Sequence, residues 1–383
     1  MSWTPGSPEI KSLWALDPRV VYLNHGSFGA TPRSVLAMQA ELRDEMEAEP
    51  IEFLGRSWPA RAAEVRERVA RFVGADPRGL ALVTNATQGV AAALDAVDWR
   101  EGDEIVVGDH GYNAVKQAIR RLVVERGVRL VEARIPFPLQ ERAQIVDAFA
   151  QAITPRTRML LVDHVTSATA LLCPVFELVA LARARGCLVL VDGAHAPGML
   201  PLDLEALGAD FYTGNLHKWV CAAKGCAIFY ASPDWRERTH APVTSHGYTL
   251  GFHEEFDWPG TFDATAWLSL PAAFEHGDRL GWQALRAKNH ALVREGRAEV
   301  AHALGVELPH SDDELLYGAM AAIPFPRGTP GSGPELNARL YAEHRIEVPF
   351  TSYDGRIFVR ISGQAYNSPA DYSSLASVLA SFG

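Results

Sequence analysis

Short apolar segments alternate with helix-like segments between residues 80 and 193, and this alternation constrains the fold more than any other feature. The apolar segments are LALVT, EIVVGD, RLVEARI, RMLLVDHV and CLVLVDG, and the helical ones between them include YNAVKQAIRRLVVERG and VFELVALARARG. Such alternation is typical of a parallel sheet that is covered by helices. The strands are almost continuously apolar, as expected when both faces of a sheet are buried. The sequence therefore predicts an α/β fold with a mostly parallel sheet.

Two more strand-like segments, ADFYTGN and GCAIFYAS, follow without a full helix between them. A parallel connection needs a long crossover, whereas antiparallel strands do not. We therefore expect an antiparallel edge to the sheet.

The chain length and a change of pattern near residue 260 predict two domains. A chain of 383 residues exceeds what one hydrophobic core usually organises. Apolar residues recur at helical spacing over 33–48 and 58–73, and a long helix is expected near 264–304. We expect an N-terminal arm over 1–20, a large domain over 21–260, and a smaller α+β domain over 261–383 against which the N-terminal segment can pack.

Composition excludes several classes of partner. The formal net charge is -10, which argues against nucleic acid and anionic membranes as partners, because both attract basic surfaces. No apolar run approaches the roughly 20 residues of a membrane span, and the N-terminus lacks the features of a signal peptide. The four cysteines form no CxxC pair and no zinc spacing, so we expect no metal, reduced thiols and a cytoplasmic location.

Polar residues gather where the apolar strands end, which is where α/β sheets bind ligands. Asp192 follows five apolar residues, and Asp163 with His164 closes the strand before it. A buried carboxylate needs compensation, so Asp192 is either a turn or cap residue, or it holds a positive charge such as a pyridinium nitrogen. The segment TNATQG (84–89) precedes a helix, whose N-terminus is a ready phosphate site, although Thr and Asn are also ordinary helix caps.

Lys218 lies in the stretch YTGNLHKWVCAAKG, among small and apolar residues. It is either an ordinary solvated lysine or an amine placed for chemistry. Packing among such neighbours would remove water from the amine, lower its pKa and make it a nucleophile. A lysine, an upstream aspartate and a phosphate-binding helix N-terminus together match the needs of pyridoxal 5′-phosphate (PLP).

Segments along most of the chain resemble one family of enzymes. They are VYLNHGSFGATP, TNATQGV, LVDGAHAPGMLPLDLEALGADFYTGNLHKWVCAAKG, PGTFDATAWL and VRISGQAYNSPADYSSLASVL. Together they are similar to the class V aminotransferase-like, fold-type I PLP enzymes, and most of all to the isopenicillin N epimerase-like branch, which includes C–S lyases of ergothioneine biosynthesis. The resemblance implies a fold-type I PLP-transferase, with a mostly parallel seven-stranded sheet and a smaller C-terminal α+β domain.

The resemblance also implies roles around the cofactor. Lys218 would form the Schiff base, and Asp192 would pair with the pyridine nitrogen. The remaining cofactor roles would fall to His195 and Thr166 near the phenolic oxygen, to Tyr112 stacked on the ring, and to Thr87, Gln88, Asn215 and His217 on the phosphate. His195 could instead satisfy a loop carbonyl, and Tyr112 could simply pack at the start of a helix.

For the substrate, the resemblance implies that Arg360 grips the α-carboxylate as a bidentate fork, with Asn24, His25 and Tyr366 in the pocket. Arg360 could instead be an exposed strand charge. Thr261 would reach the phosphate of the neighbouring subunit in a homodimer with sites at the interface, or it could be a helix cap.

Three reactions at Cα of an amino acid follow from such a site: racemisation, β-elimination and transamination. An epimerase needs a second acid/base opposite Lys218, for which Tyr112 or His25 could serve. A C–S lyase could use Tyr112 to protonate the leaving sulfur of a cysteine conjugate or its sulfoxide. No cysteine occurs between residues 227 and 383, which disfavours a cysteine desulfurase. A non-catalytic PLP-fold binding protein is disfavoured because Lys218 and Asp192 are both present.

Overall fold

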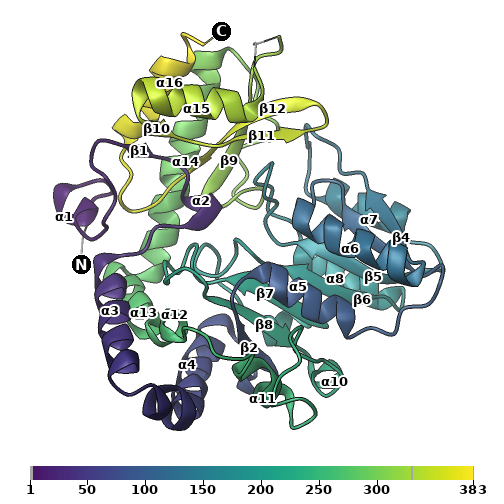
Figure 1. Cartoon of the computed structure of the whole chain (residues 1–383). Coiled ribbons are helices and arrows are strands. Elements are labelled where there is room, and N and C mark those ends of the chain that lie inside the picture. The colour runs from purple at the N-terminus through teal and green to yellow at the C-terminus, as the bar shows by residue number, and fades with distance from the viewer. Residues whose placement is uncertain (1–2, 329–330, 383) are drawn as a thin grey trace.

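The computed structural model describes residues 3–328 and 331–382, and its largest element is a seven-stranded sheet (Figure 1). The strand order is β2-β8-β7-β6-β5-β3-β4. Their bounds are β2 (Leu80–Val83), β3 (Glu104–Gly108), β4 (Arg129–Ala133), β5 (Thr157–Asp163), β6 (Leu188–Asp192), β7 (Phe211–Asn215) and β8 (Ala227–Ala231). The predicted mostly parallel sheet is confirmed. The predicted antiparallel edge is wrong in its position, because antiparallel β8 lies inside the sheet, between β2 and β7.

Helices cover both faces of this sheet, and the alternation of side chains along each strand shows how. Residues such as Val107, Leu161 and Phe229 pack with α5 and α6 on one face. Their strand neighbours, such as Val106 and Leu160, pack with α4, α7 and α8 on the other. The helices of this part are α3 (Arg33–Ala48), α4 (Trp58–Val73), α5 (Ala86–Asp95), α6 (Asn113–Arg126), α7 (Ala143–Ala152), α8 (Val175–Ala184), α9 (Leu204–Leu207), α10 (Pro233–Arg236) and α11 (Phe252–Asp257).

The two helices predicted over 33–48 and 58–73 are confirmed as α3 and α4. Gly74 ends α4 in the left-handed conformation, with φ of 63°, which glycine adopts without steric cost. Between these helices lies a π-helical turn, Ile51–Ser57, which the apolar pattern does not indicate.

The long helix expected near 264–304 is wrong, because three helices occupy this range: α12 (Thr265–Leu268), α13 (Leu270–Leu280) and α14 (Trp282–Leu304). Gly281 separates α13 from α14 with φ of 77°, and Pro271 lies in the first turn of α13, where the missing N–H costs nothing. Among the described residues, no helix is both long and apolar enough to cross a membrane.

A second, smaller sheet lies near the C-terminus and is antiparallel, in the order β11-β12-β9. Its strands are β9 (Met320–Pro324), β11 (Phe350–Tyr353) and β12 (Arg356–Ser362), and its helices are α14, α15 (Gly333–His344) and α16 (Pro369–Leu379). Figure 1 shows this part at the top, above the large sheet. Arg360 lies on β12, the central strand of the small sheet. Its side chain reaches the loop after β5 of the large sheet, where it donates to the Ser167 carbonyl.

The N-terminal segment contributes α1 (Pro8–Lys11), β1 (Val21–Tyr22) and α2 (His25–Phe28). Strand β1 pairs in parallel with β10 (Ile346–Glu347), so this stretch lies against the C-terminal part. The division into 1–20, 21–260 and 261–383 stays a prediction, and residues 1–2, 329–330 and 383 of these ranges lie outside the described residues.

We expect Gly89→Ala to destabilise the fold, because Gly89 is where α5 touches β7. A Cβ atom there would lie 2.2 Å from Oγ1 of Thr213, whose hydroxyl donates to the Ile228 carbonyl at 2.8 Å. Overpacking costs about 1–3 kcal/mol, and the better helix propensity of alanine returns up to about 1 kcal/mol. Urea unfolding should show a net loss of about 1–2 kcal/mol. Ala91→Ser on the same helix is the control, and equal effects of both variants would contradict the packing argument.

Candidate active site

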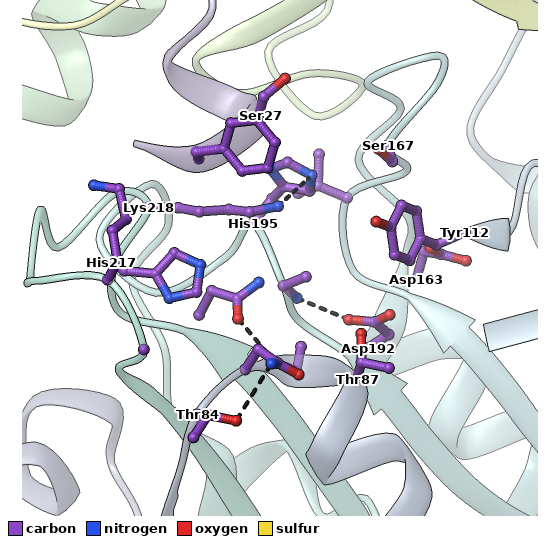
Figure 2. A pocket seen from close by; sticks show the side chains of 18 residues that line it. Ser27, Thr84, Thr87, Tyr112, Asp163, Ser167, Asp192, His195, His217 and Lys218 are labelled. Atoms are coloured by element: carbon purple, nitrogen blue, oxygen red, sulfur yellow. Dashed lines mark hydrogen bonds between the residues drawn. The ribbon is translucent and has the colours of Figure 1, made fainter. Parts of the chain in front are cut away.

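A cavity of about 510 Å³ opens at the carboxyl ends of β5, β6 and β7, the position that α/β sheets offer to ligands. Figure 2 shows its lining from close by. We call it the central cavity. It is lined by Ser27, Phe28, Thr84, Asn85, Ala86, Thr87, Tyr112, Asp163, Val165, Ser167, Asp192, Ala194, His195, Asn215, His217, Lys218, Lys224 and Gly225.

Lys218 projects into the central cavity from the loop after β7. Its Nζ lies 3.2 Å from Nε2 of His195. Burial and the nearby Arg360 guanidinium lower the pKa of Lys218 to about 7, although Asp192 acts in the opposite direction. At neutral pH a large fraction of this amine is therefore unprotonated and nucleophilic.

His195 is buried beside this amine. Burial, with Lys218 and Arg360 adding to it, lowers the pKa of His195 well below its usual value, so the ring is neutral. Its Nε2 faces the lysine, and its Nδ1 is a buried atom without a partner among the described residues. The interpretation that His195 satisfies a loop carbonyl is therefore not supported. A neutral imidazole with an unused nitrogen fits a bound ligand that offers a hydrogen-bonding oxygen.

Asp192 ends β6 and is also buried, with Oδ1 accepting from the Ala194 backbone N–H at 3.0 Å. Burial raises the pKa of Asp192, while the Ala194 N–H and Lys218 act against this rise. A buried carboxylate in this position is stabilised by a cation that binds next to it. A protonated pyridine nitrogen supplies such a cation.

The N-terminus of α5 forms one end of the central cavity. Asn85 caps this helix by accepting from the Gln88 backbone N–H at 3.0 Å, and Asn215 Oδ1 accepts from the Ala86 N–H at 2.9 Å. Thr84, Asn85, Ala86 and Thr87 line the cavity. Helix N-termini with such hydroxyl neighbours bind phosphate. The cap pattern TNAT is the sequence signal that indicates Thr84 and Asn85, which the sequence prediction did not name.

Of two other residues predicted at the phosphate, one lines the central cavity and the other does not. His217 lines the central cavity, and burial lowers its pKa to about 4, so it can act as a neutral hydrogen-bonding group. Gln88 does not line it, because its Oε1 accepts from the backbone N–H and hydroxyl of Thr84. The Gln88 side chain holds the turn that carries Thr84, and a role of Gln88 at the phosphate stays a prediction.

Arg360 lies directly behind the cavity wall and is 3% exposed, so the alternative of an exposed strand charge is wrong. Its Nη1 donates to the Ser167 carbonyl at 2.7 Å, and its Nη2 donates to the Ser27 hydroxyl at 2.9 Å. Burial lowers its pKa to about 10, so it stays charged at neutral pH. Among the described residues it has no carboxylate partner. A buried guanidinium without a counter-charge suits a carboxylate ligand.

Three residues predicted around the substrate do not line the central cavity. His25 accepts from or donates to Tyr366 at 2.8 Å through Nδ1, and its Nε2 contacts the Lys218 carbonyl at 3.0 Å. Asn24 Nδ2 donates to Glu347 at 2.9 Å. His25 therefore supports the backbone of Lys218 and does not face the amine from across the cavity. The hypothesis that His25 is the second acid/base is corrected accordingly.

Thr166 and Thr261 also lie outside the cavity lining. The Thr166 hydroxyl accepts from the Leu171 N–H at 2.8 Å and contacts Thr169, so it stabilises its own loop. Thr261 is exposed. The structure corrects the approach of Thr166 to the cofactor, whereas the role of Thr261 toward a neighbouring subunit stays a prediction.

Tyr112 forms the side of the central cavity away from Lys218. It precedes α6, its side chain makes no capping bond, and it is 47% exposed. Figure 2 shows its hydroxyl turned toward the Lys218 amine. The alternative that Tyr112 packs at the helix start does not fit this exposure. Ser27, Ser167 and Lys224 also line the cavity. Ser27 and Lys224 lie within the motifs VYLNHGSFGATP and YTGNLHKWVCAAKG, but the sequence predicts no role for any of the three.

Comparisons with known proteins agree with this geometry. The Aminotransferase class-V family model matches residues 21–348. The chain belongs to the class V aminotransferase family. It is 34% identical to an isopenicillin N epimerase of Streptomyces clavuligerus, over 97% of each chain. It is 31% identical to a probable chloroplastic L-cysteine desulfhydrase of Arabidopsis thaliana, over 96% of this chain and 84% of the other.

Among solved structures, the chain resembles the apo cysteine desulfurase from Thermococcus onnurineus NA1, with a TM-score of 0.83 and 19% identity, over 100% of this chain and 99% of that one. This similarity confirms the predicted fold. The resemblance to class V aminotransferase-like enzymes and to isopenicillin N epimerases is confirmed as well.

The cofactor of this class V family member is pyridoxal 5′-phosphate, and the residues of the central cavity fit it. Lys218 offers the amine for covalent attachment, and Asp192 offers a carboxylate for the ring nitrogen. The N-terminus of α5 offers the Thr84 and Thr87 hydroxyls and the positive end of a helix to the phosphate. The buried, neutral His195 offers a ring nitrogen to the phenolic oxygen.

We expect the rate of PLP binding to the cofactor-free enzyme to rise with pH through a midpoint near 7, because the unprotonated Lys218 amine is the reactive form. Arg360→Met should raise this midpoint, because removal of a nearby positive charge favours the ammonium form. Stopped-flow absorbance across pH measures both midpoints. Arg356→Met on the same strand is the control and should leave the midpoint unchanged. A midpoint near the ordinary lysine value of 10.5 would contradict the assignment.

Proposed function

We propose that this class V enzyme is an amino-acid epimerase or racemase that acts at Cα, in the manner of its isopenicillin N epimerase relatives. The observation that carries the proposal is the position of Tyr112, whose hydroxyl points across the central cavity toward Lys218. Inversion at a carbon needs one group that removes a proton from one face and a second that returns it to the other. Lys218 and Tyr112 are two proton-carrying groups in this relation.

In the proposed reaction, each residue around the cofactor has a separate role. PLP supplies an aldehyde carbon for the substrate amine and a ring that accepts the electron pair left at Cα. Arg360 binds the substrate α-carboxylate and thereby fixes which bond at Cα faces the ring. Lys218 removes the α-proton, since its amine has a pKa of about 7 and is largely unprotonated at neutral pH. Asp192 keeps the ring nitrogen protonated, and Tyr112 delivers a proton to the opposite face.

A second candidate function is a C–S lyase that eliminates the β-substituent of a cysteine conjugate or its sulfoxide. It is favoured by the similarity to an L-cysteine desulfhydrase, and the same Tyr112 hydroxyl could protonate the leaving sulfur. An aminotransferase reaction is a weaker candidate. No cysteine is among the residues that line the central cavity, which gives no support to a cysteine desulfurase.

The two candidate reactions predict different products. An epimerase should exchange the α-hydrogen of its substrate for deuterium in D₂O and form both configurations, which NMR and chiral chromatography measure. A C–S lyase should instead release pyruvate and ammonia from a cysteine conjugate. Lys218→Ala should lose either activity. Release of pyruvate without inversion would replace the epimerase proposal by the lyase.

Tyr112→Phe distinguishes proton transfer on the two faces of the substrate Cα. We expect inversion to fall by about 100-fold or more, which is the usual contribution of one positioned acid or base. Exchange with retention of configuration should continue, because Lys218 still removes and returns the proton on its own side. Tyr341→Phe, an exposed tyrosine on α15, is the matched control. Undiminished inversion in Tyr112→Phe would show that another group is the second acid.

We also propose that the enzyme works as a homodimer in which Thr261 reaches the phosphate of the neighbouring subunit. Thr261 is exposed and lies outside the cavity of its own chain. Thr261→Ala should weaken PLP binding about tenfold to 100-fold, the cost of one hydrogen bond to a charged group, while sedimentation still reports a dimer. Ser374→Ala on α16 is the control. A monomeric enzyme with full PLP affinity would contradict the proposal.

A further inference from the structure

A second carboxyl group, Asp163, lies beside Asp192 and is not used by the mechanism above. Asp163 ends β5 and Asp192 ends β6, and the two are direct partners in the parallel register. Paired residues of neighbouring parallel strands point to the same face, with backbones about 4.8 Å apart. Both carboxyl groups line the central cavity and both are less than 10% exposed. The cavity therefore holds two neighbouring carboxyl groups, whereas a pyridinium nitrogen brings one positive charge.

Two lysines among the described residues act on the pair. Lys218 acts on Asp192, and it is the amine that would bond the cofactor. Lys116 is the cation that acts on Asp163, but its amine already contacts Glu132 at 2.8 Å. Cys173, also near Asp163, is kept neutral by burial, which raises its pKa. Two buried carboxylates with one cation between them do not both ionise. Burial and the charge of Asp192 raise the pKa of Asp163 well above its usual value, so Asp163 is the group that keeps a proton.

A protonated carboxyl group both accepts and donates, and both functions need partners when it is buried. The backbone N–H of Tyr112 faces the Asp163 carboxyl and acts to lower its pKa, and in Figure 2 Asp163 lies beside Tyr112. Asp192, its register partner on the neighbouring strand, offers a carboxylate that can accept from its O–H.

We propose that Asp163 is a positioning residue: a neutral carboxylic acid that donates to Asp192, orients it toward the PLP ring nitrogen, and holds the Tyr112 backbone over the ring. Asp192 and Asp163 together carry one negative charge, which matches the single charge of the pyridinium. Asp163 thereby links Asp192, the carboxylate that would keep the ring nitrogen protonated, to the loop that carries Tyr112. The proposal concerns cofactor binding and does not depend on which reaction the enzyme catalyses.

Two variants of the full-length enzyme test this assignment. Asp163→Asn keeps one acceptor and one donor without a charge, so PLP affinity should stay within about threefold of the parent, and the visible spectrum of the bound cofactor should keep its shape. Asp163→Leu removes both functions, so affinity should fall about tenfold or more, with a larger share of the cofactor unprotonated at the ring nitrogen. Fluorescence titration and absorbance measure both effects. Equal losses in both variants, or no loss in Asp163→Leu, would overturn the proposal.

A measurement without cofactor keeps the test valid if Asp163→Leu does not fold. In the cofactor-free parent, Asp163 keeps a proton in the folded chain but loses it in the unfolded chain above the ordinary aspartate pKa of 3.8. The parent should therefore lose stability, relative to Asp163→Asn, as pH rises from about 5 toward 8. The difference in melting temperature between the two proteins should grow over this range. A constant difference would mean that Asp163 is ionised in the folded chain, which would overturn the proposal.

Discussion

Removal of water from one amine and one carboxylate, held in the same cavity, is the constraint on which the rest of this structure depends. Asp192 is buried and Lys218 is half-buried, and removing either charge from water alone would be costly. Burial lowers the pKa of the amine, which favours its nucleophilic form. Burial raises the pKa of the Asp192 carboxyl, so the carboxylate form is favoured only when a cation such as a pyridinium binds beside it. The surrounding elements position these two groups. They also hold two charges, on Asp192 and Arg360, for which PLP and substrate would supply the opposite charges.

The site is assembled from segments that are far apart in the chain. The large sheet supplies Asp192 and Lys218 at neighbouring strand ends, and α5 supplies the phosphate end. The C-terminal part supplies Arg360, whose contacts with Ser167 and Ser27 join it to the large sheet and to the N-terminal segment. Further contacts hold the two parts together, since Thr351 donates to the Ala168 carbonyl and Tyr353 donates to Asp109 at 2.8 Å. Arg360, the residue that we propose for the substrate carboxylate, therefore lies where the two parts meet.

Much of the fold was predictable because long-range order follows from local patterns here. Continuous apolar strands and helical spacing indicate a covered parallel sheet, and the motif around Lys218 indicates the cofactor. The misjudged elements have local causes that the pattern does not show. The helical pattern continues across Gly281, whose positive φ breaks the expected helix. Strand β8 lies inside the sheet because β2 pairs with it. The sequence of β8 does not indicate whether another strand pairs with its second edge.

The sequence by itself determined the residue types of the chemistry: a lysine, an aspartate at a strand end and a capped helix N-terminus, each carried by a contiguous motif. Only the tertiary structure decided the direction of each side chain. His25 and Tyr112 are equally plausible acids in the sequence, yet His25 contacts the Lys218 carbonyl and Tyr112 faces the amine. Likewise, the role that we propose for Asp163 depends on its register with Asp192, which only the structure shows. Direction and register arise from packing between distant segments, which a linear pattern does not contain.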